Sequence, residues 1–356
     1  MLAHSGGAIF AQDGTIIIRD SLFHLNTAEQ QGGDITVSGN AEVLFSDLTC
    51  FNSTSFSSGG ALYFSGSVTG SITDATVRYS SAVQGAAVTT AGNAEVQFLG
   101  CILSNGTSTS SGGAVSTRQN SRPHFVNCFM GHNGASSYGG SVLAADTSSP
   151  SFLDCTFRHN FAGTSGGSLF AQDSSTLHLE ESLVTRSFSE SVGAGVGVAG
   201  NAKVFAKNTN FTRNQVSIFG GGLGASDRGG LYLSNCVVDF NRGLYGGGIG
   251  ITQYAILRMF GSKVVNNTAY AGGGIRASGR AEMTLQGTDF TRNSVNTSGG
   301  GISTSDQIYA SISGCIFRVG PYLPSPAEPS YLTFRRPTMR SPAVQSRRLL
   351  RLVCES

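Results

Sequence analysis

Residues 155–169 read CTFRHNFAGTSGGSL, and variants of this stretch recur along most of the chain. The stretch ends on an aliphatic residue, Leu169, that follows two small residues. Twelve aliphatic residues stand at this place, each 26 or 27 residues after the one before: Ile9, Ile35, Leu62, Val88, Val115, Val142, Leu169, Val196, Leu223, Ile249, Ile275 and Ile302. So constant a period indicates a repeat architecture, in which each unit stacks on the next.

Two strands can be placed by counting from these aliphatic anchors. Offsets 8 and 10 are mostly apolar, as at Leu177 and Leu179, and this alternation is typical of a strand with one buried face. A further strand follows, with Cys often at offset 13 and Phe at offset 15, as at Cys155 and Phe157. We therefore expect three short strands per repeat, counting the strand that begins at the anchor itself.

Turns separate the strands. Offset 4 carries Gly in five repeats and Asp in five others, and offset 12 carries mostly Asp, Asn or Gly. These residues enter turns and left-handed backbone conformations readily. Asn marks a third turn at offset 17 or 18, where its amide is expected to bond the Asn one repeat away and the bent backbone. The Asn residues are Asn26, Asn52, Asn105, Asn133, Asn160, Asn214, Asn241, Asn267 and Asn293.

This pattern predicts an all-β fold, a right-handed parallel β-helix solenoid of about twelve coils, because parallel strands joined by long crossovers are right-handed in nearly all proteins. A leucine-rich repeat has a similar period but needs a helical or 3₁₀ return, whereas the return here contains Gly166 and Gly167 among Ser and Thr, which form helices poorly. One stacked aliphatic column is predicted to point into the core, formed by Ile9, Leu62, Val142, Leu169, Leu223 and Ile275.

Two motifs that alternate in register carry a family resemblance over residues 1–320. Gly6-Gly-Ala-Ile9 and Phe23-His-Leu-Asn26 resemble the paired GGAI and FxxN motifs of the polymorphic outer membrane proteins of chlamydiae. The second motif returns at Phe157–Asn160, Phe211–Asn214 and Phe290–Asn293. The resemblance implies a pectin-lyase-like β-helix and a secreted adhesive role.

Composition limits the partners and the location. The formal net charge is only +2 and charged residues make up 12% of the chain, which argues against a nucleic-acid partner. No apolar run approaches 18 residues, so no transmembrane segment is expected. No signal peptide is visible, since Met1 lies only five residues before the first glycine pair, and we expect the chain to be a fragment. The resemblance and the composition favour an extracellular or cell-surface location.

Acidic residues on adjacent coils are the candidates for chemistry. Asp146 and Asp173 share one column, and Asp154 and Glu181 share another. Carboxyl pairs at such spacing cleave polysaccharides in some enzymes. However, Gly, Asn or Ser fills these columns in other coils, which indicates a turn requirement. The neighbouring strands are expected to carry only Ser, Thr and apolar residues, with no catalytic Lys or Arg. We therefore predict no catalytic residue and only modest stability effects when Asp146 and Asp173 become Asn.

No metal or cofactor site is predicted. The sequence lacks CxxC and HxxxH clusters, and the six histidines show no metal spacing: His4, His24, His124, His132, His159 and His178. The GxGxxG match Gly195–Gly200 lies in register with the repeat and opens no helix. Cys101, Cys128 and Cys155 occupy one column on consecutive coils, close enough either for a disulfide or for a ladder of buried thiols.

Glycosylation and the C-terminal segment stay open. Sequons stand at Asn52, Asn105, Asn210, Asn266 and Asn296. Of these, Asn210 is expected to point outward, whereas Asn52 and Asn105 fall in the Asn turn column and are expected to point inward. Residues 321–356 hold six of the eight prolines, with six arginines against two glutamates, and are predicted to be a disordered tail. The tail is either a segment that contacts nucleic acid or membrane, or non-coding sequence translated after a mispredicted splice site.

These observations favour a structural or adhesive module that binds protein or glycan through its ladder faces, without catalysis. A polysaccharide lyase or hydrolase on the same scaffold is the alternative, and it should show an interrupted column with convergent charges. A bare last coil would expose strand edges around Ile302 and Ile312, which predicts end-to-end self-association.

Overall fold

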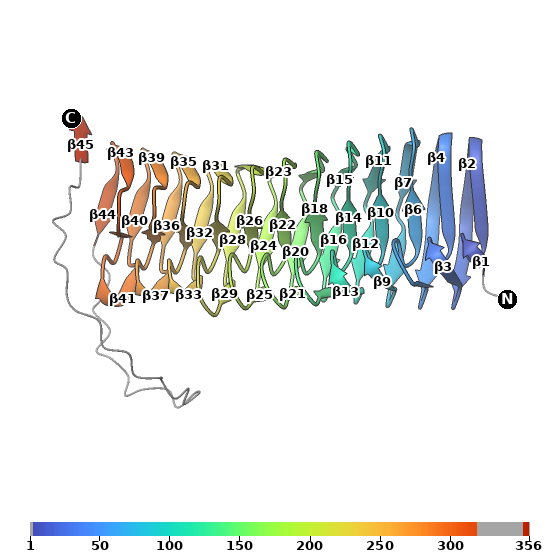
Figure 1. Ribbon diagram of the computed structural model, residues 1–356, viewed down its shortest axis with the longest axis horizontal. Helices are drawn as coiled ribbons and strands as arrows, with labels where there is room; N and C mark the ends of the chain where they lie inside the picture. Colours follow the sequence, from blue (N-terminus) through green and yellow to red (C-terminus); the bar gives the residue numbers. More distant parts are fainter. Residues whose placement is uncertain (1–2, 319–351, 356) are drawn as a thin grey trace, which may run out of the picture.

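The computed structural model describes residues 3–318 and 352–355, and every element in those ranges is a β-strand. The strands stack as successive coils along one rod, from β1 and β2 near the N-terminus to β41–β44 at the other end (Figure 1). All strand pairings are parallel, and each aliphatic anchor pairs with the anchor of the next coil, as Val142 does with Leu169 and Leu169 with Val196. The predicted all-β parallel solenoid is therefore confirmed.

The strands of the first two coils run together as β2 (Ile9–His24) and β4 (Ile35–Phe51). Later coils divide the same path into three strands. The first strands, which start at the anchors, are β6 (Leu62–Phe64), β10 (Val88–Thr90), β14 (Val115–Thr117), β18 (Val142–Ala144), β22 (Leu169–Ala171), β26 (Val196–Val198), β30 (Leu223–Ala225), β34 (Ile249–Ile251), β38 (Ile275–Ala277) and β42 (Ile302–Thr304). The second strands are β7 (Thr69–Thr73), β11 (Glu95–Leu99), β15 (His124–Val126), β19 (Ser151–Leu153), β23 (Thr176–Glu180), β27 (Lys203–Lys207), β31 (Gly230–Ser234), β35 (Ile256–Phe260), β39 (Glu282–Gln286) and β43 (Tyr309–Ser313). The third strands are β8 (Thr76–Arg78), β12 (Ile102–Ser104), β16 (Phe129–Gly131), β20 (Thr156–Arg158), β24 (Leu183–Thr185), β28 (Asn210–Thr212), β32 (Val237–Asp239), β36 (Lys263–Val265), β40 (Asp289–Thr291) and β44 (Ile316–Arg318).

A fourth short strand per coil was not predicted. These strands form a separate parallel sheet of β1 (Ala3–Ser5), β3 (Thr27–Gln31), β5 (Thr54–Ser55), β9 (Ser81–Gln84), β13 (Thr107–Ser111), β17 (Gly134–Ala135), β21 (Phe161–Ala162), β25 (Phe188–Ser189), β29 (Gln215–Val216), β33 (Arg242–Tyr245), β37 (Thr268–Ala271) and β41 (Ser294–Ser298). The prediction of three strands was incomplete because these two- to five-residue strands are rich in Ser, Thr and Ala and show little apolar alternation.

The anchors form the predicted aliphatic column of the core. Leu62, Val142, Leu169, Leu223 and Ile275 are buried, whereas Ile9, in the first coil, is only partly buried against the core. Rings also stack inside the rod, with Phe98, Phe125 and Phe152 on consecutive coils at centroid distances of 4.5 and 5.0 Å. The inside of the rod is one continuous apolar core. Only the outward side chains and the corners are left to bind anything.

Left-handed residues close the corners as predicted. All the residues at offset 4 have positive φ, including Asp146 (57°), Asp173 (60°) and Gly200 (67°). The offset-12 residues Asp154 (52°) and Glu181 (51°) do too. A further left-handed glycine precedes each anchor, as Gly166 precedes Leu169 with φ at 66°. A Cβ on the next residue, Gly167, would collide with the carbonyl oxygen of Ala194, so the close approach of the coils requires glycine there.

The Asn column consists of two neighbouring positions. The second position points inward: Asn241 Oδ1 accepts from the Asn214 backbone N–H at 2.9 Å, and Asn241 Nδ2 donates to Phe211 O at 2.8 Å. This confirms the predicted ladder. The first position is left-handed and faces out, and Asn52 and Asn105 occupy it with φ of 56° and 57° and are only half-buried. The prediction that they point inward was wrong, because the two positions had been merged.

The other sequons differ in exposure. Asn210 is exposed on β28, as predicted, and Asn296 is exposed on β41. Asn266 is half-buried at the left-handed position of its corner, with φ at 56°.

The C-terminal segment falls mostly outside the described residues, and with it most of the predicted tail 321–356. Within it, β45 (Leu352–Glu355) pairs in parallel with β43, where Ile312 lies opposite Cys354. The backbone edge of β43, predicted to be open around Ile312, is therefore paired. In the described ranges β42, which starts at Ile302, pairs only with β38. Those ranges contain no helix that is long and apolar enough to cross a membrane.

Candidate binding site

The first acidic pair holds the coils together. Asp146 Oδ2 accepts from the Gln119 backbone N–H at 2.9 Å, and Asp173 Oδ2 accepts from the Asp146 N–H at 3.1 Å. Asp227 repeats the pattern with Gly200 at 3.2 Å. Each carboxylate thus caps the same position in the preceding coil. We call this column the acidic corner, and its carboxylates already have structural partners.

The second acidic pair has a basic neighbour that sequence reasoning missed. Lys207, on β27, donates to Glu180 Oε1 at 2.6 Å. Glu180 precedes Glu181 and lies one coil after Asp154, so Lys207 is two coils from Asp154. The prediction that the neighbouring strands lack Lys and Arg was therefore wrong, because Lys207 is one residue beyond the apolar offsets that defined the strand. The hydrogen bond to Glu180, followed by the charges of Glu180 and Glu181, raises the pKa of Lys207, so this amine stays protonated.

The cysteine column consists of free thiols inside the core. Cys128 Sγ lies 3.3 Å from Phe98 O and 3.4 Å from Val126 O, and Cys101 and Cys155 repeat this arrangement. Hydrogen bonds along the row and burial raise the pKa of Cys101, whereas the hydrogen bond from Cys128 lowers the pKa of Cys155. In residues 3–318 and 352–355 no three His, Cys, Asp or Glu side chains are grouped to hold a metal ion.

The histidines fall into outward columns. His132 and His159 are one coil apart, as predicted, and their rings stack with centroids 5.1 Å apart. His124 Nδ1 lies 2.6 Å from Ser151 Oγ on the next second strand. The GxGxxG match spans β26, which pairs in register with β22 and β30 and opens no helix.

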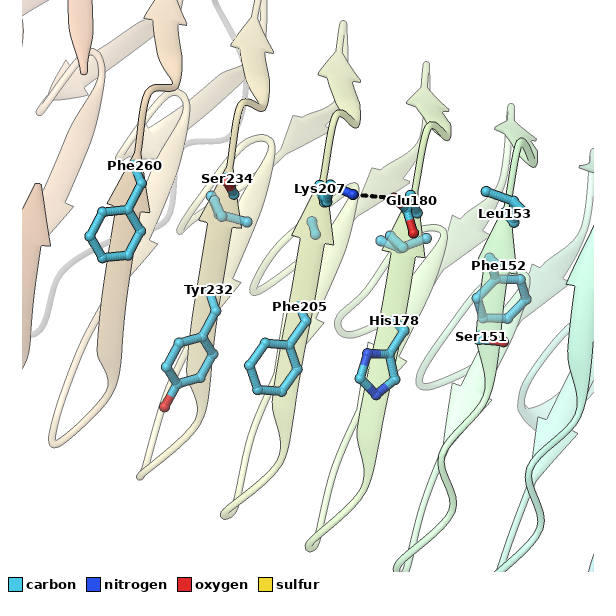
Figure 2. Close-up of a pocket in the computed structure, with 13 residues that line it drawn as sticks. Ser151, Phe152, Leu153, His178, Glu180, Phe205, Lys207, Tyr232, Ser234 and Phe260 are labelled. Carbon is cyan, nitrogen blue, oxygen red and sulfur yellow. Dashed lines mark hydrogen bonds and ion pairs between the residues drawn. The ribbon is translucent and has the colours of Figure 1, made fainter. Parts of the chain in front are cut away.

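An outward row of rings crosses the second-strand face. His178, Phe205 and Tyr232 lie opposite one another on β23, β27 and β31, and Figure 2 shows them side by side along the rod. The rings are nearly parallel, with centroid distances of 5.4 and 4.7 Å. The Arg258 guanidinium lies 5.8 Å from the Tyr232 centroid and extends the row by one coil. We call His178, Phe205 and Tyr232 the aromatic row.

The aromatic row lines an open groove of about 510 Å³ on the rod. Ring faces in full contact would be roughly 3.5–4 Å apart, so rings with centroids at 4.7 and 5.4 Å do not cover one another fully. Phe205 is 38% exposed. The Lys207–Glu180 ion pair and the Ser234 side chain border the rings on one side (Figure 2). The groove thus offers apolar ring surface with polar groups along its edge.

One buried carboxyl interrupts the small residues that precede the anchors. Asp34 is fully buried, and it accepts from Ser53 Oγ at 2.5 Å and Asn26 Nδ2 at 2.9 Å. Burial raises its pKa despite these bonds. The equivalent residue of the next coil is Ala61. Its partners Asn26 and Ser53 stand at the same corner of two consecutive coils, so Asp34 bonds inside the rod, and nothing places a substrate beside it.

A signal for the aromatic row was present in the sequence. Offset 9 lies between the two buried offsets and reads His178, Phe205 and Tyr232 on three consecutive coils. Large apolar rings at an outward position are informative because they stay partly in water. The prediction considered only the buried face of this strand and passed over the column.

A comparison with protein families agrees with this architecture. The sequence model of the right handed beta helix region family matches residues 35–216, which are 182 of the 356 residues. The chain therefore belongs to the family of right-handed β-helix regions, which confirms the predicted handedness. No curated protein and no solved structure gives a significant match to the chain.

Proposed function

We propose that this protein is a non-catalytic adhesive module of the cell surface or the extracellular space, which binds protein or glycan through its ladder faces. The aromatic row in its groove is the observation that carries this proposal. Exposed rings in a concave surface with polar edges are the usual form of a ligand site. The motif resemblance to secreted adhesive repeats points to the same class of protein and to the same location.

The regularity of the rod supports binding over catalysis. An enzyme on this scaffold needs convergent charged groups. The carboxylates of the acidic corner instead accept hydrogen bonds from backbone N–H groups of the preceding coil. The same position of this corner carries Gly, Asp or Gln in every coil, always with a left-handed backbone. That restriction selects a backbone conformation.

A lyase or hydrolase is the second candidate, and one observation favours it. Glu180 and Lys207 line the groove as an ion pair, and the charge of Glu181 also acts on Lys207. A lyase of this kind needs a base to remove a proton, and the raised pKa of Lys207 keeps that amine in its charged form. The ion pair is also exposed to water, which weakens it as a catalytic device.

Two assays separate the candidates. Purified protein is incubated with a panel of acidic polysaccharides, and unsaturated and reducing ends are measured. We expect no release from the wild type, from the Asp146→Asn/Asp173→Asn variant or from the Lys207→Gln variant. Release by the wild type that either variant abolishes would establish the enzyme.

The second assay measures adhesion on printed arrays of extracellular matrix proteins and defined oligosaccharides. The wild type is expected to retain a restricted set of them. The variant Phe205→Ser/Tyr232→Ser removes the faces of the aromatic row and should lose that set. The variant Phe56→Ser/Tyr254→Ser is the matched control, because it removes one Phe and one Tyr that are exposed outside the groove.

A further inference from the structure

A second outward column carries positive charge. Four consecutive coils place His132, His159, Arg186 and Arg213 at the left-handed position of the third corner, with φ between 53° and 60°. Arg158 precedes His159 on β20. All five side chains are exposed. They lie where the third strands β16, β20, β24 and β28 bend into β17, β21, β25 and β29 (Figure 1). We call these five residues the basic ridge.

The charges of the basic ridge are not compensated by neighbouring acids. The described residues form three ion pairs, His4–Glu29, Arg122–Glu95 and Lys207–Glu180, and none involves the ridge. Glu190 and Asp239, on the adjoining elements, pair with none of its cations in the part of the chain that the structure describes. Burial, followed by the charges of Arg158, His132 and Arg186, lowers the pKa of His159. At neutral pH His159 is therefore mostly an uncharged hydrogen-bonding group, and Arg158, Arg186 and Arg213 carry the positive charge that favours a bound anion.

Two aromatic rings lie beside the ridge. Phe161 and Phe188 come two residues after His159 and Arg186, and they pair on β21 and β25. Their rings are parallel within 4°, with centroids 5.9 Å apart, so the two rings are not in full face-to-face contact. Phe161 is 44% exposed. Exposed ring surface of this kind packs against the apolar faces of sugar rings, whereas an inorganic anion has no apolar face that could contact it.

We propose that the basic ridge binds a linear sulfated polysaccharide, with its sulfates on the cations and its sugar faces on Phe161 and Phe188. Coils repeat at roughly 4.8 Å, and the His132 and His159 rings are 5.1 Å apart. A pyranose linked through opposite sides of its ring advances by about one such step, so successive sugars meet Arg158, Arg186 and Arg213 on three consecutive coils. Duplex DNA places a phosphate about every 3.4 Å along each strand, which does not match. Sulfate oxygens accept hydrogen bonds from the parallel N–H groups of Arg186 and Arg213.

This inference rests on the proposed binding function but uses a different surface from the groove. The probe is a fully sulfated heparin octasaccharide, measured by titration calorimetry at several salt concentrations. The variant Arg186→Gln/Arg213→Gln should bind at least tenfold more weakly, with a salt slope reduced by about 1 to 2. The variant Arg228→Gln/Arg280→Gln loses the same charge from exposed arginines five residues after the anchors Leu223 and Ile275, and should stay within twofold of the wild type.

Each remaining outcome decides the inference. Binding is expected to vanish with the desulfated octasaccharide, and to persist in the groove variant Phe205→Ser/Tyr232→Ser. Equal losses in the two arginine variants would reduce the effect to net charge and overturn the ridge. A single-stranded oligonucleotide that binds as tightly as the octasaccharide would overturn the glycan assignment. If only the groove variant loses octasaccharide binding, the ridge inference fails and the proposed adhesive function stands.

Discussion

The acidic corner and the basic ridge use the same backbone conformation for different ends. Asp173 and Arg186 have φ of 60° and 53°, and both stand at a bend between strands. The Asp173 carboxylate accepts the Asp146 N–H and is part of the ladder. The Arg186 guanidinium is exposed and forms no ion pair in the described residues. In a solenoid, a column of equal residues indicates function only where the side chains are not already bonded to the next coil.

The largest effect on stability is expected in the anchor column, whose packing holds both corners rigid. Leu169→Ala should lower the free energy of unfolding by about 2–5 kcal/mol, because a fully buried side chain leaves a cavity between Val142 and Val196. Chemical denaturation monitored by circular dichroism measures this loss. An unchanged stability would mean that the anchors do not face the core and that neither corner is correctly placed.

A buried carboxyl contrasts with the exposed acidic corner. The folded pKa of Asp34 is raised above its unfolded value near 4, so its stabilising contribution is complete below about pH 4 and is lost as the pH rises through the folded pKa. Asp34→Asn should therefore gain stability over the wild type between pH 4 and 7, with the two converging at low pH. Denaturation midpoints across this range test it. A wild type that gains stability with rising pH relative to the variant would contradict the burial of this carboxyl.

The smallest effect compares the two corners directly. Arg186→Gly removes a side chain that has no ion-pair partner among the described residues, and it relieves the left-handed strain, so it should be neutral or stabilise by about 1 kcal/mol. Asp173→Gly relieves the same strain but loses a hydrogen bond, which contributes about 0.5–1.5 kcal/mol. Asp173→Gly should thus be less stable than Arg186→Gly by about 1 kcal/mol. Equal unfolding free energies would remove the distinction between a bonded corner and a free one.

The sequence predicted the repeat well because its strongest signals are steric. An anchor such as Leu169 must be aliphatic to fill the core, and a corner such as Gly200 or Asp173 must tolerate a left-handed backbone. Both demands return in every coil and therefore appear as columns. The structural role of Asp146 and Asp173 was predictable for the same reason, since Gly replaces them elsewhere.

The features that the sequence did not predict depend on a one-residue difference in position or on columns that span only a few coils. Treating offsets 17 and 18 as one position merged the outward Asn52 and Asn105 with the inward Asn column. The fourth strand escaped because backbone pairing between coils stabilises it without an apolar pattern. The aromatic row and the basic ridge each cover only three or four coils, so they do not appear as columns of the whole repeat. Binding surfaces need variety between coils, whereas folding needs uniformity.

The central claim is that the rod binds ligands through outward columns and performs no chemistry. Its most direct test is the dissociation constant of the wild type, of Phe205→Ser/Tyr232→Ser and of Phe56→Ser/Tyr254→Ser for the array protein or glycan that the wild type retains most strongly. The account predicts at least a tenfold weakening for the groove variant, no more than a twofold change for the control, and an unaltered ligand after incubation. Equal affinity in all three proteins, or a cleaved ligand, would contradict it.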